Sequence, residues 1–302
     1  MSHDGSPVRC ACVDIGSNTT RLLVAEADGG EGPLRVVCAR RAFVGLPLGA
    51  AGAPVGVERA ARLAAVVAGH VALARDHGAR RVRVVATAAL RRCADRDEVV
   101  AAVERAARVP VAVLSAEEEA RLAFAGATHG VDVAADVRVG VADIGGGSSE
   151  LVVGTLDGGV RWFASVAAGS GLLTAAFLAS DPPAPAELEA AAAAAADTFA
   201  GLRPPALGLA IAVGGSAMSL RRVVGEEASA EALRRALDQV VARPSAEVAV
   251  RLGLHPARAR LLPAGLLLLG EAAAVLGRPL RLGQGGLREG VVLHEVARAV
   301  AG

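Results

Sequence analysis

Hydrophobic and polar positions follow one pattern twice along this chain. In segment 13–24 an apolar run ends at Asp14, a turn of small residues follows, and a second apolar run resumes. Such a pattern predicts a strand, a tight turn and a second strand. Segment 142–153 repeats the pattern, with Asp143 standing 129 residues after Asp14 and with Asp, Ile, Gly and the first Leu unchanged. An ungapped repeat of this kind predicts a duplicated domain, although two unrelated hairpins would look similar.

The rest of the chain alternates between helical and strand periodicity. Short β-branched or apolar runs predict strands, and longer runs with apolar residues three or four apart predict helices. The pattern predicts strands at 82–86, 111–114, 209–213 and 278–282, and helices at 57–77, 97–108, 115–128, 186–202, 230–241, 246–252, 257–276 and 289–300. A further helix is expected after the glycine-rich segment 214–216. Interleaved strands and helices indicate an α/β fold. A short polar segment, 130–136, is expected to join a first domain (1–129) to a second (130–302).

Composition limits the classes of protein that the chain can belong to. It is 53% hydrophobic and 21% charged with a net charge of +1, so we expect a globular protein that does not bind nucleic acid through a basic face. The most apolar stretch, 261–276, is interrupted by Pro263 and Glu271 and falls short of a membrane span. Four cysteines fit no zinc pattern, and no export signal is visible. A cytoplasmic protein without membrane association is therefore expected.

The turns of the two repeats are candidate phosphate sites. Small residues allow backbone N–H groups to approach an anion, and hydroxyl or amide side chains add further donors. Three consecutive glycines in the second turn are hard to explain by a plain hairpin, because glycine loses the most conformational entropy on folding. The candidate phosphate-binding residues are Gly16, Ser17, Asn18 and Thr19 in the first loop and Gly145, Gly146, Gly147 and Ser148 in the second.

Carboxylates flank both loops and suggest a divalent cation. Asp143 and Glu150 bracket the second loop and offer hard oxygen ligands, which Mg²⁺ or Mn²⁺ prefers. Asp14 precedes the first loop. A carboxylate next to a phosphate is favourable if a cation lies between the two negative groups. The alternative for the second loop is a simple hairpin with a solvated Glu150.

Three acids, Glu117 to Glu119, begin a helix, where they would interact favourably with its dipole. Glu118 stands in capping-box register with Ser115. Successive side chains on a helix point about 100° apart, so the three acids cannot share one role. Glu119 could face a cleft and take a proton from an attacking water. Arg91, where a strand passes into a helix, is a candidate ligand for phosphate oxygens or an ordinary surface residue.

Together these motifs resemble the exopolyphosphatase and guanosine pentaphosphate phosphatase (Ppx/GppA) family. The resemblance extends from residue 13 to residue 293. It rests on VDIGSNTTRLL at 13–23, ATAALR at 86–91, SAEEEARL at 115–122, DIGGGSSEL at 143–151, LGLHPARARLLPAG at 252–265 and GGLREG at 285–290. The family belongs to the superfamily of actin, heat-shock chaperones and sugar kinases. It implies two duplicated ribonuclease H-like domains with a cleft between them.

The resemblance also implies a function. The chain is expected to release terminal phosphate from inorganic polyphosphate or guanosine pentaphosphate, as a short form of the family and a homodimer. Glu119 would deprotonate water, Arg91 would contact phosphate and act in catalysis, and the two loops would cradle phosphate. Asp143 and Glu150, helped by Asp14, would hold Mg²⁺ or Mn²⁺.

Three positions depart from the family pattern. Ala116 replaces a usual Gly, Leu172 replaces a common Arg, and Asp95 replaces a frequent Asn. The absence of an Arg at position 172 puts the binding of a polyanionic substrate in question. Two alternatives are an ATP-dependent kinase or ATPase on the same fold, and a non-catalytic regulator that binds polyphosphate or an alarmone.

Overall fold

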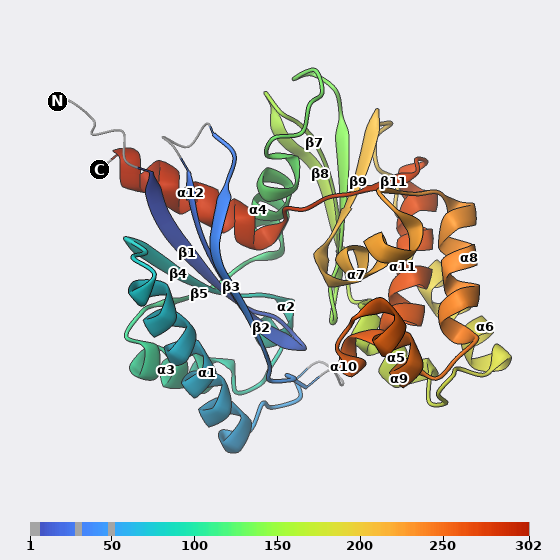
Figure 1. The fold of residues 1–302 in the computed structure, drawn as a ribbon, viewed down its shortest axis with the longest axis horizontal. Coiled ribbons are helices and arrows are strands. Elements are labelled where there is room, and N and C mark those ends of the chain that lie inside the picture. The colour runs from blue at the N-terminus through green and yellow to red at the C-terminus, as the bar shows by residue number, and fades with distance from the viewer. Residues whose placement is uncertain (1–6, 28–31, 48–51, 302) are drawn as a thin grey trace. The chain divides into compact units, whose positions relative to one another are not determined.

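The computed structural model describes residues 7–27, 32–47 and 52–301, and the chain divides into two compact units. Unit 1 comprises Met1–Val131 together with Leu287–Gly302, and unit 2 comprises Asp132–Gly286. Each unit is built on its own mixed β-sheet with helices packed against it (Figure 1).

The sheet of unit 1 has the strand order β3-β2-β1-β4-β5. β1 (Val8–Ile15), β2 (Thr19–Ala27) and β3 (Arg35–Phe43) are antiparallel neighbours. β4 (Arg81–Ala86) and β5 (Val111–Val113) then join in parallel beside β1. The predicted strand, turn and strand are thus the first two strands of this sheet.

Helices cover both faces of this sheet. On one face, strand residues such as Val13 and Leu22 pack with residues of α1 (Val57–Asp76) and α3 (Arg96–Ala107). On the other face, the last helix, α12 (Leu287–Ala301), buries strand side chains that include the two cysteines of β1.

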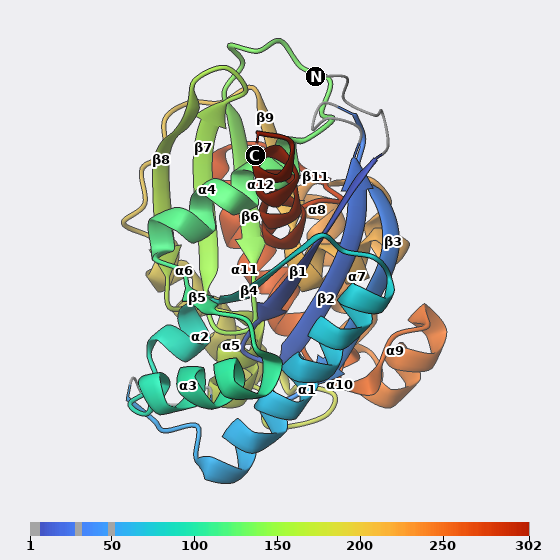
Figure 2. The same cartoon turned by 90° about the vertical axis from the view of Figure 1, so that its left-hand side faces the viewer.

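Two further helices complete unit 1. The one-turn α2 (Ala88–Arg91) follows β4, and α4 (Ala116–Thr128) follows β5. α4 packs along α12, as both views of the ribbon show (Figures 1 and 2).

Unit 2 repeats the strand order of unit 1. β6 (Val139–Ile144), β7 (Ser149–Thr155) and β8 (Gly159–Val166) are antiparallel neighbours. β9 (Leu209–Val213) and β11 (Leu280–Leu282) follow in parallel beside β6. A two-residue strand, β10 (Glu227–Ala228), is added at the edge beyond β11. The shared order confirms both the duplication and the α/β class.

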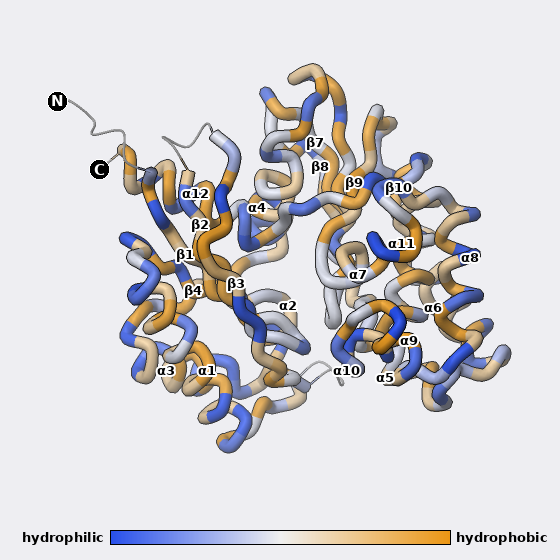
Figure 3. The backbone as a smooth tube through the Cα atoms, in the orientation of Figure 1, coloured by the Kyte–Doolittle hydropathy of each residue, from blue (hydrophilic) through white to orange (hydrophobic). Residues whose placement is uncertain are grey.

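The helices of unit 2 enclose its core with many alanine and leucine side chains. They are α5 (Ser170–Phe177), α6 (Pro185–Phe199), α7 (Gly214–Val224), α8 (Ala230–Val241), α9 (Ser245–Leu252), α10 (Pro256–Ala259) and α11 (Leu262–Leu276). Hydrophobic and hydrophilic positions alternate along surface helices such as α8, which is the amphipathic pattern that the sequence predicts (Figure 3). Within the described residues, no helix is long and apolar enough to cross a membrane.

The structure departs from the sequence prediction in several places, and β8, β10 and α5 lie where no element is predicted. The helix expected at 257–276 is two helices, α10 and α11, because Pro263 cannot donate the N–H that a continuous helix would require there. β3 was not predicted, since three arginines in nine residues obscure its strand pattern. The sequence pattern places residues 287–302 in the second domain, whereas they belong to unit 1 because α12 completes the apolar layer over β1 and β2.

The contact between α12 and α4 is unusually close at Gly290. A Cβ atom at this position would lie 1.9 Å from the backbone carbonyl oxygen of Leu122 in α4. α12 is also held by Glu295, a buried carboxylate that lies 2.7 Å from Arg81 and 3.6 Å from Arg83 of β4. Packing and ion pairing together fix α12, and through it α4, against the sheet.

Replacing Gly290 by alanine should therefore disrupt unit 1. The added methyl group meets a backbone atom that cannot rotate away, so Gly290→Ala should lower the free energy of unfolding by about 3 kcal/mol. Gly270→Ala in α11 is the matched control, because nothing lies within 4 Å of its added Cβ. That change should be neutral or stabilise by up to about 1 kcal/mol. Urea unfolding of both variants checks this, and equal stability would contradict the close crossing.

Candidate active site

Three predicted site segments of unit 1 begin at the same edge of its sheet. Ile15 at the end of β1 pairs with Ala86 at the end of β4, and Ala86 pairs with Val113 at the end of β5. The first glycine loop, the α2 segment with Arg91 and the start of α4 therefore all follow the carboxyl ends of neighbouring strands. This is the edge at which α/β domains bind their ligands.

Hydrogen bonds from segment 45–46 fix the carbonyl groups of the first loop. The N–H of Leu46 donates to the carbonyl oxygen of Ser17 at 2.6 Å, and the N–H of Gly45 donates to that of Asn18 at 3.2 Å. In a planar trans peptide the carbonyl and the following N–H point in opposite directions. The amides of Asn18 and Thr19 therefore point away from segment 45–46, in the arrangement of an anion-binding nest.

The second loop is fixed in the same way by the start of α5. The carbonyl oxygen of Gly145 accepts hydrogen bonds from the N–H and Oγ of Ser170 at 2.9 and 3.1 Å. The carbonyl oxygen of Gly146 accepts from the N–H groups of Gly171 and Leu172 at 2.9 and 3.0 Å. The amides that follow these two carbonyls consequently point away from α5.

Each loop is closed by an equivalent backbone bond. The N–H of Gly16 donates to the carbonyl oxygen of Thr19 at 3.2 Å, and that of Gly145 donates to Ser148 at 3.0 Å. The repeat in sequence is therefore also a repeat in hydrogen bonding.

The two carboxylates that flank the second loop lie opposite each other across the hairpin. Asp143 and Glu150 are direct cross-strand partners on β6 and β7. Glu150 is buried, and its Oε1 accepts a hydrogen bond from the Oγ of Ser165 at 2.9 Å. Asp143 lies against the N-terminus of α7, where a Cβ added to Gly214 would be 2.3 Å from its Oδ1.

This pair could hold a small divalent cation. Among the described residues there is no cluster of three or more His, Cys, Asp or Glu side chains suited to a metal. Mg²⁺ is often bound by one or two carboxylates and completes its shell with substrate phosphates and water, so two protein ligands fit such an ion.

Asp14 occupies a different environment in unit 1. Its Oδ1 is buried without a hydrogen-bond partner in the described part of the chain. Burial raises the pKa of Asp14, and the neighbouring Arg21 and Arg288 offset this only in part. Arg288 belongs to the GGLREG segment, so α12 brings a cation close to the first loop.

The three acids of α4 lie in three separate environments, as the helix geometry predicted. Glu118 forms the capping box with Ser115, through bonds of 3.2 and 2.8 Å. Glu117 pairs with Arg121 at 2.6 Å on the exposed face of the helix. Glu119 is 7% exposed and points inward.

Arg91 is the ion-pair partner of Glu119. Its Nη1 lies 3.4 Å from Oε2 of Glu119 and also donates to the carbonyl oxygen of Leu114. In this structure Arg91 therefore orients the buried carboxylate. Whether it also contacts phosphate stays a prediction.

The three departures from the family pattern have defined positions. Asp95 accepts backbone hydrogen bonds from Val55 and Gly56 at 2.8 and 2.9 Å; burial raises its pKa, but these bonds bring it below its ordinary value. Leu172 lies in the first turn of α5 beside the second loop, and Ala116 is the first residue of α4.

Several supporting residues could not be found from sequence. Segment 45–46, Ser165 and Ser170 act through backbone bonds or cross-strand contacts that no motif encodes. Gly214 stands in a Gly-Gly-Ser segment at the start of α7. Its contact with Asp143 depends on the parallel pairing of β6 with β9.

Comparison with known proteins agrees with this architecture. The model of the Ppx/GppA phosphatase family matches residues 50–299. Exopolyphosphatase 2 of Mycobacterium tuberculosis is 30% identical over 318 aligned residues, covering 97% of this chain and 99% of that protein. An uncharacterized protein of Streptomyces coelicolor is 37% identical over 187 residues, which span 61% of this chain and 54% of that protein.

A solved structure shows the same fold. The crystal structure of the Aquifex aeolicus member of the Ppx/GppA family superposes with a TM-score of 0.80 at 25% identity, covering 97% of this chain and 99% of that one. The fold and the family model together define a two-domain phosphatase of the actin-like class. The chain belongs to the Ppx/GppA phosphatase family.

Measurements of unfolding free energy can separate the role of Glu118 from that of Glu117. Glu118→Ala removes the side chain that caps Ser115 and should cost about 1 kcal/mol of unfolding free energy. Glu117→Ala removes only an exposed i,i+4 pair and should change stability by less than about 0.5 kcal/mol. Chemical denaturation measures both, and equal losses would show that the capping box does not stabilise α4.

Proposed function

We propose that this chain is a metal-dependent exopolyphosphatase that removes the terminal phosphate of inorganic polyphosphate by hydrolysis. The observation that carries the proposal is the buried Glu119 carboxylate, held by Arg91 at the sheet edge that also bears the first loop. A transfer to water needs a group that accepts the proton of the water, and a positioned carboxylate supplies one.

In the proposed reaction, the loops at Gly16 and Gly145 bind phosphate oxygens through their oriented amides. Little covalent chemistry is required of the protein in phosphoryl transfer, so positioning and charge stabilisation supply most of the rate. Fixed carbonyls mean that the loops need little reorganisation when an anion arrives.

Glu119 acts on the attacking water. As the water oxygen forms a bond to the terminal phosphorus, Glu119 accepts the proton that the water loses. The bond between that phosphorus and the bridging oxygen breaks, and the electron pair stays on the bridging oxygen. The products are orthophosphate and a chain shorter by one phosphate.

Asp143 and Glu150 are the proposed ligands for Mg²⁺ or Mn²⁺. Bound there, the cation would neutralise charge on the phosphate oxygens. Ser165 and the N-terminus of α7 hold these two carboxylates in place.

Polyphosphate is the favoured substrate because the relative that matches along nearly its full length bears the name exopolyphosphatase. Guanosine pentaphosphate, which also ends in a phosphoanhydride, is proposed as a second substrate. Homodimer formation and a cytoplasmic location stay predictions.

Glu119→Gln should lower phosphate release from long-chain polyphosphate by at least a hundredfold, because the amide cannot accept the proton. Polyphosphate binding should change little. Glu117→Gln, on the exposed side of the same helix, is the matched control and should retain full activity. Phosphate release with Mg²⁺ or Mn²⁺, and polyphosphate binding, are measured for all three proteins.

Other results of this assay would favour the alternatives. Full activity of Glu119→Gln would show that Glu119 is not the general base. Binding of polyphosphate without hydrolysis by the unmodified protein would indicate a regulator, and consumption of ATP that depends on an acceptor would indicate a kinase.

The metal assignment can be tested through Gly214. Gly214→Ala would press a methyl group onto the Asp143 carboxylate, so the Mg²⁺ concentration for half-maximal phosphate release should rise about tenfold. Gly225→Ala is the control, since Gly225 also has a positive φ but has nothing within 4 Å of an added Cβ. Both variants should lose roughly 1–3 kcal/mol of stability from backbone strain, because both positions have a positive φ. An unchanged Mg²⁺ dependence in Gly214→Ala would argue against Asp143 as a ligand.

A further inference from the structure

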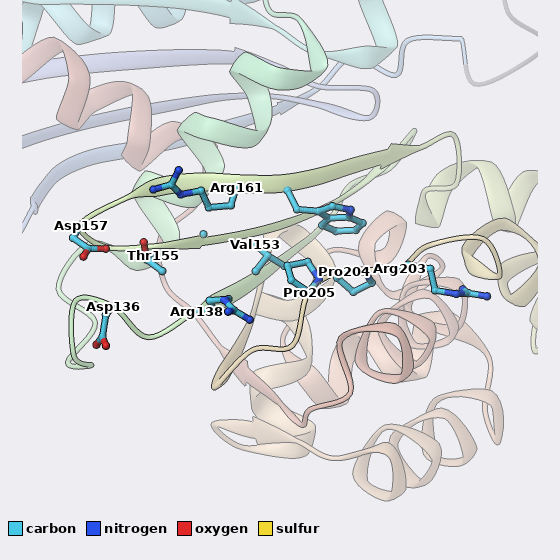
Figure 4. Close-up of a pocket in the computed structure, with 11 residues that line it drawn as sticks. Asp136, Arg138, Val153, Thr155, Asp157, Arg161, Arg203, Pro204 and Pro205 are labelled. Carbon is cyan, nitrogen blue, oxygen red and sulfur yellow. The ribbon is translucent and has the colours of Figure 1, made fainter.

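Unit 2 contains a cavity of about 670 Å³ at the sheet edge opposite the second loop. It lies where β6 begins, β7 ends and β8 begins, and residues 203–205 form its other wall (Figure 4). Its volume falls in the range of small-molecule sites. None of its lining residues belongs to the phosphate loops or the proposed metal site.

The cavity has an apolar wall. Val153 and Trp162 are direct cross-strand partners on β7 and β8, so their side chains share one face of the sheet. Pro204 and Pro205 also line the cavity, beside Val153 (Figure 4). An indole ring and proline rings provide surfaces on which a planar ring can stack.

Arginine side chains lie at the two ends of this apolar wall. Arg138 and Arg203 flank Val153, Pro204 and Pro205 on opposite sides (Figure 4). Arg138 donates to the carbonyl oxygen of Ala206 at 2.9 Å, which ties the start of β6 to the proline segment. Arg203 uses Nη1 for the carbonyl oxygens of Ala200 and Leu202, at 2.7 and 2.8 Å.

The acidic residues of the cavity are not distributed evenly. Asp136 and Asp157 lie toward the Arg138 end, away from Arg203 (Figure 4). The pKa of Asp157 is lowered chiefly by its hydrogen bond with Thr155, and to a smaller extent by backbone hydrogen bonds and the charge of Arg161. Among the residues that line this cavity, Arg203 is the charged group at one end, whereas the other end carries two arginines and two carboxylate acceptors.

We propose that this cavity binds a purine nucleoside monophosphate. The base stacks on Trp162 and the proline segment, Arg203 binds the phosphate, and Asp136 accepts a hydrogen bond from a ribose hydroxyl. Arginine suits this role because its planar group can donate two parallel hydrogen bonds to a phosphate. The site is distinct from the proposed hydrolytic site and does not depend on it.

Trp162 provides a direct readout of this site. It is the only tryptophan of the chain, which contains no tyrosine, so intrinsic tryptophan fluorescence reports on the cavity wall alone. Guanosine and adenosine 5′-monophosphates are the probes, because they lack a phosphoanhydride bond that the proposed hydrolysis could cleave. We expect a saturable change in fluorescence with these nucleotides and a much weaker response to inorganic phosphate or guanosine.

Substitutions then locate the bound nucleotide. Arg203→Ala should raise the Kd for guanosine 5′-monophosphate about tenfold and leave phosphate release from polyphosphate unchanged. Arg234→Ala, an exposed arginine of α8, is the matched control and should not alter the Kd. Glu119→Gln should retain the fluorescence titration, which separates this site from the hydrolytic one.

Three results would overturn the proposal. They are the absence of a saturable change with either nucleotide, an unchanged Kd in Arg203→Ala, and an equal response to inorganic phosphate alone. None of these results bears on the exopolyphosphatase activity, which is measured separately.

Discussion

The orientation of a few peptide carbonyls is the constraint on which the candidate site depends. Glycine-rich loops have many accessible conformations, and only some of them direct N–H groups toward an anion. In both units a neighbouring segment donates hydrogen bonds to the loop carbonyls and so selects the conformation. The N-terminus of α5 is used in this way. Helix N-termini commonly bind anions themselves, but the first amides of α5 are bonded to loop carbonyls and act as a support.

Glu119 depends on contacts that are distant in sequence. The capping box of Ser115 and Glu118 fixes where α4 begins, and Arg91 holds the Glu119 side chain. The axis of α4 is set by its crossing with α12 at Gly290. Local capping and long-range packing therefore act on the same helix. A general base must lie within hydrogen-bond reach of its water, so small displacements of this helix would matter to the proposed chemistry.

Much of the fold could be predicted from the sequence because its signals are local. The paired strand-turn-strand segments, the cap at Ser115 and the helical periodicity of α1 and α8 all follow from neighbouring residues. The donors at 45–46, the bond from Ser165 to Glu150 and the packing of α12 on unit 1 could not be predicted. They arise from strands and helices that meet only in the folded chain, where no residue type signals its partner. β3 was missed for a related reason, since its role as an edge strand comes from pairing with β2.

The assignment of α12 to unit 1 has a consequence for the order in which the chain can fold during synthesis. All residues of unit 2 leave the ribosome before α12 does. Until then, the face of the first sheet that carries Cys10, Leu23 and Val85 lacks the helix that buries it. The domain that is begun first is thus completed last, and its nascent form carries an uncovered apolar surface while its neighbour is already able to fold. A chaperone that shields such a surface would act during this interval.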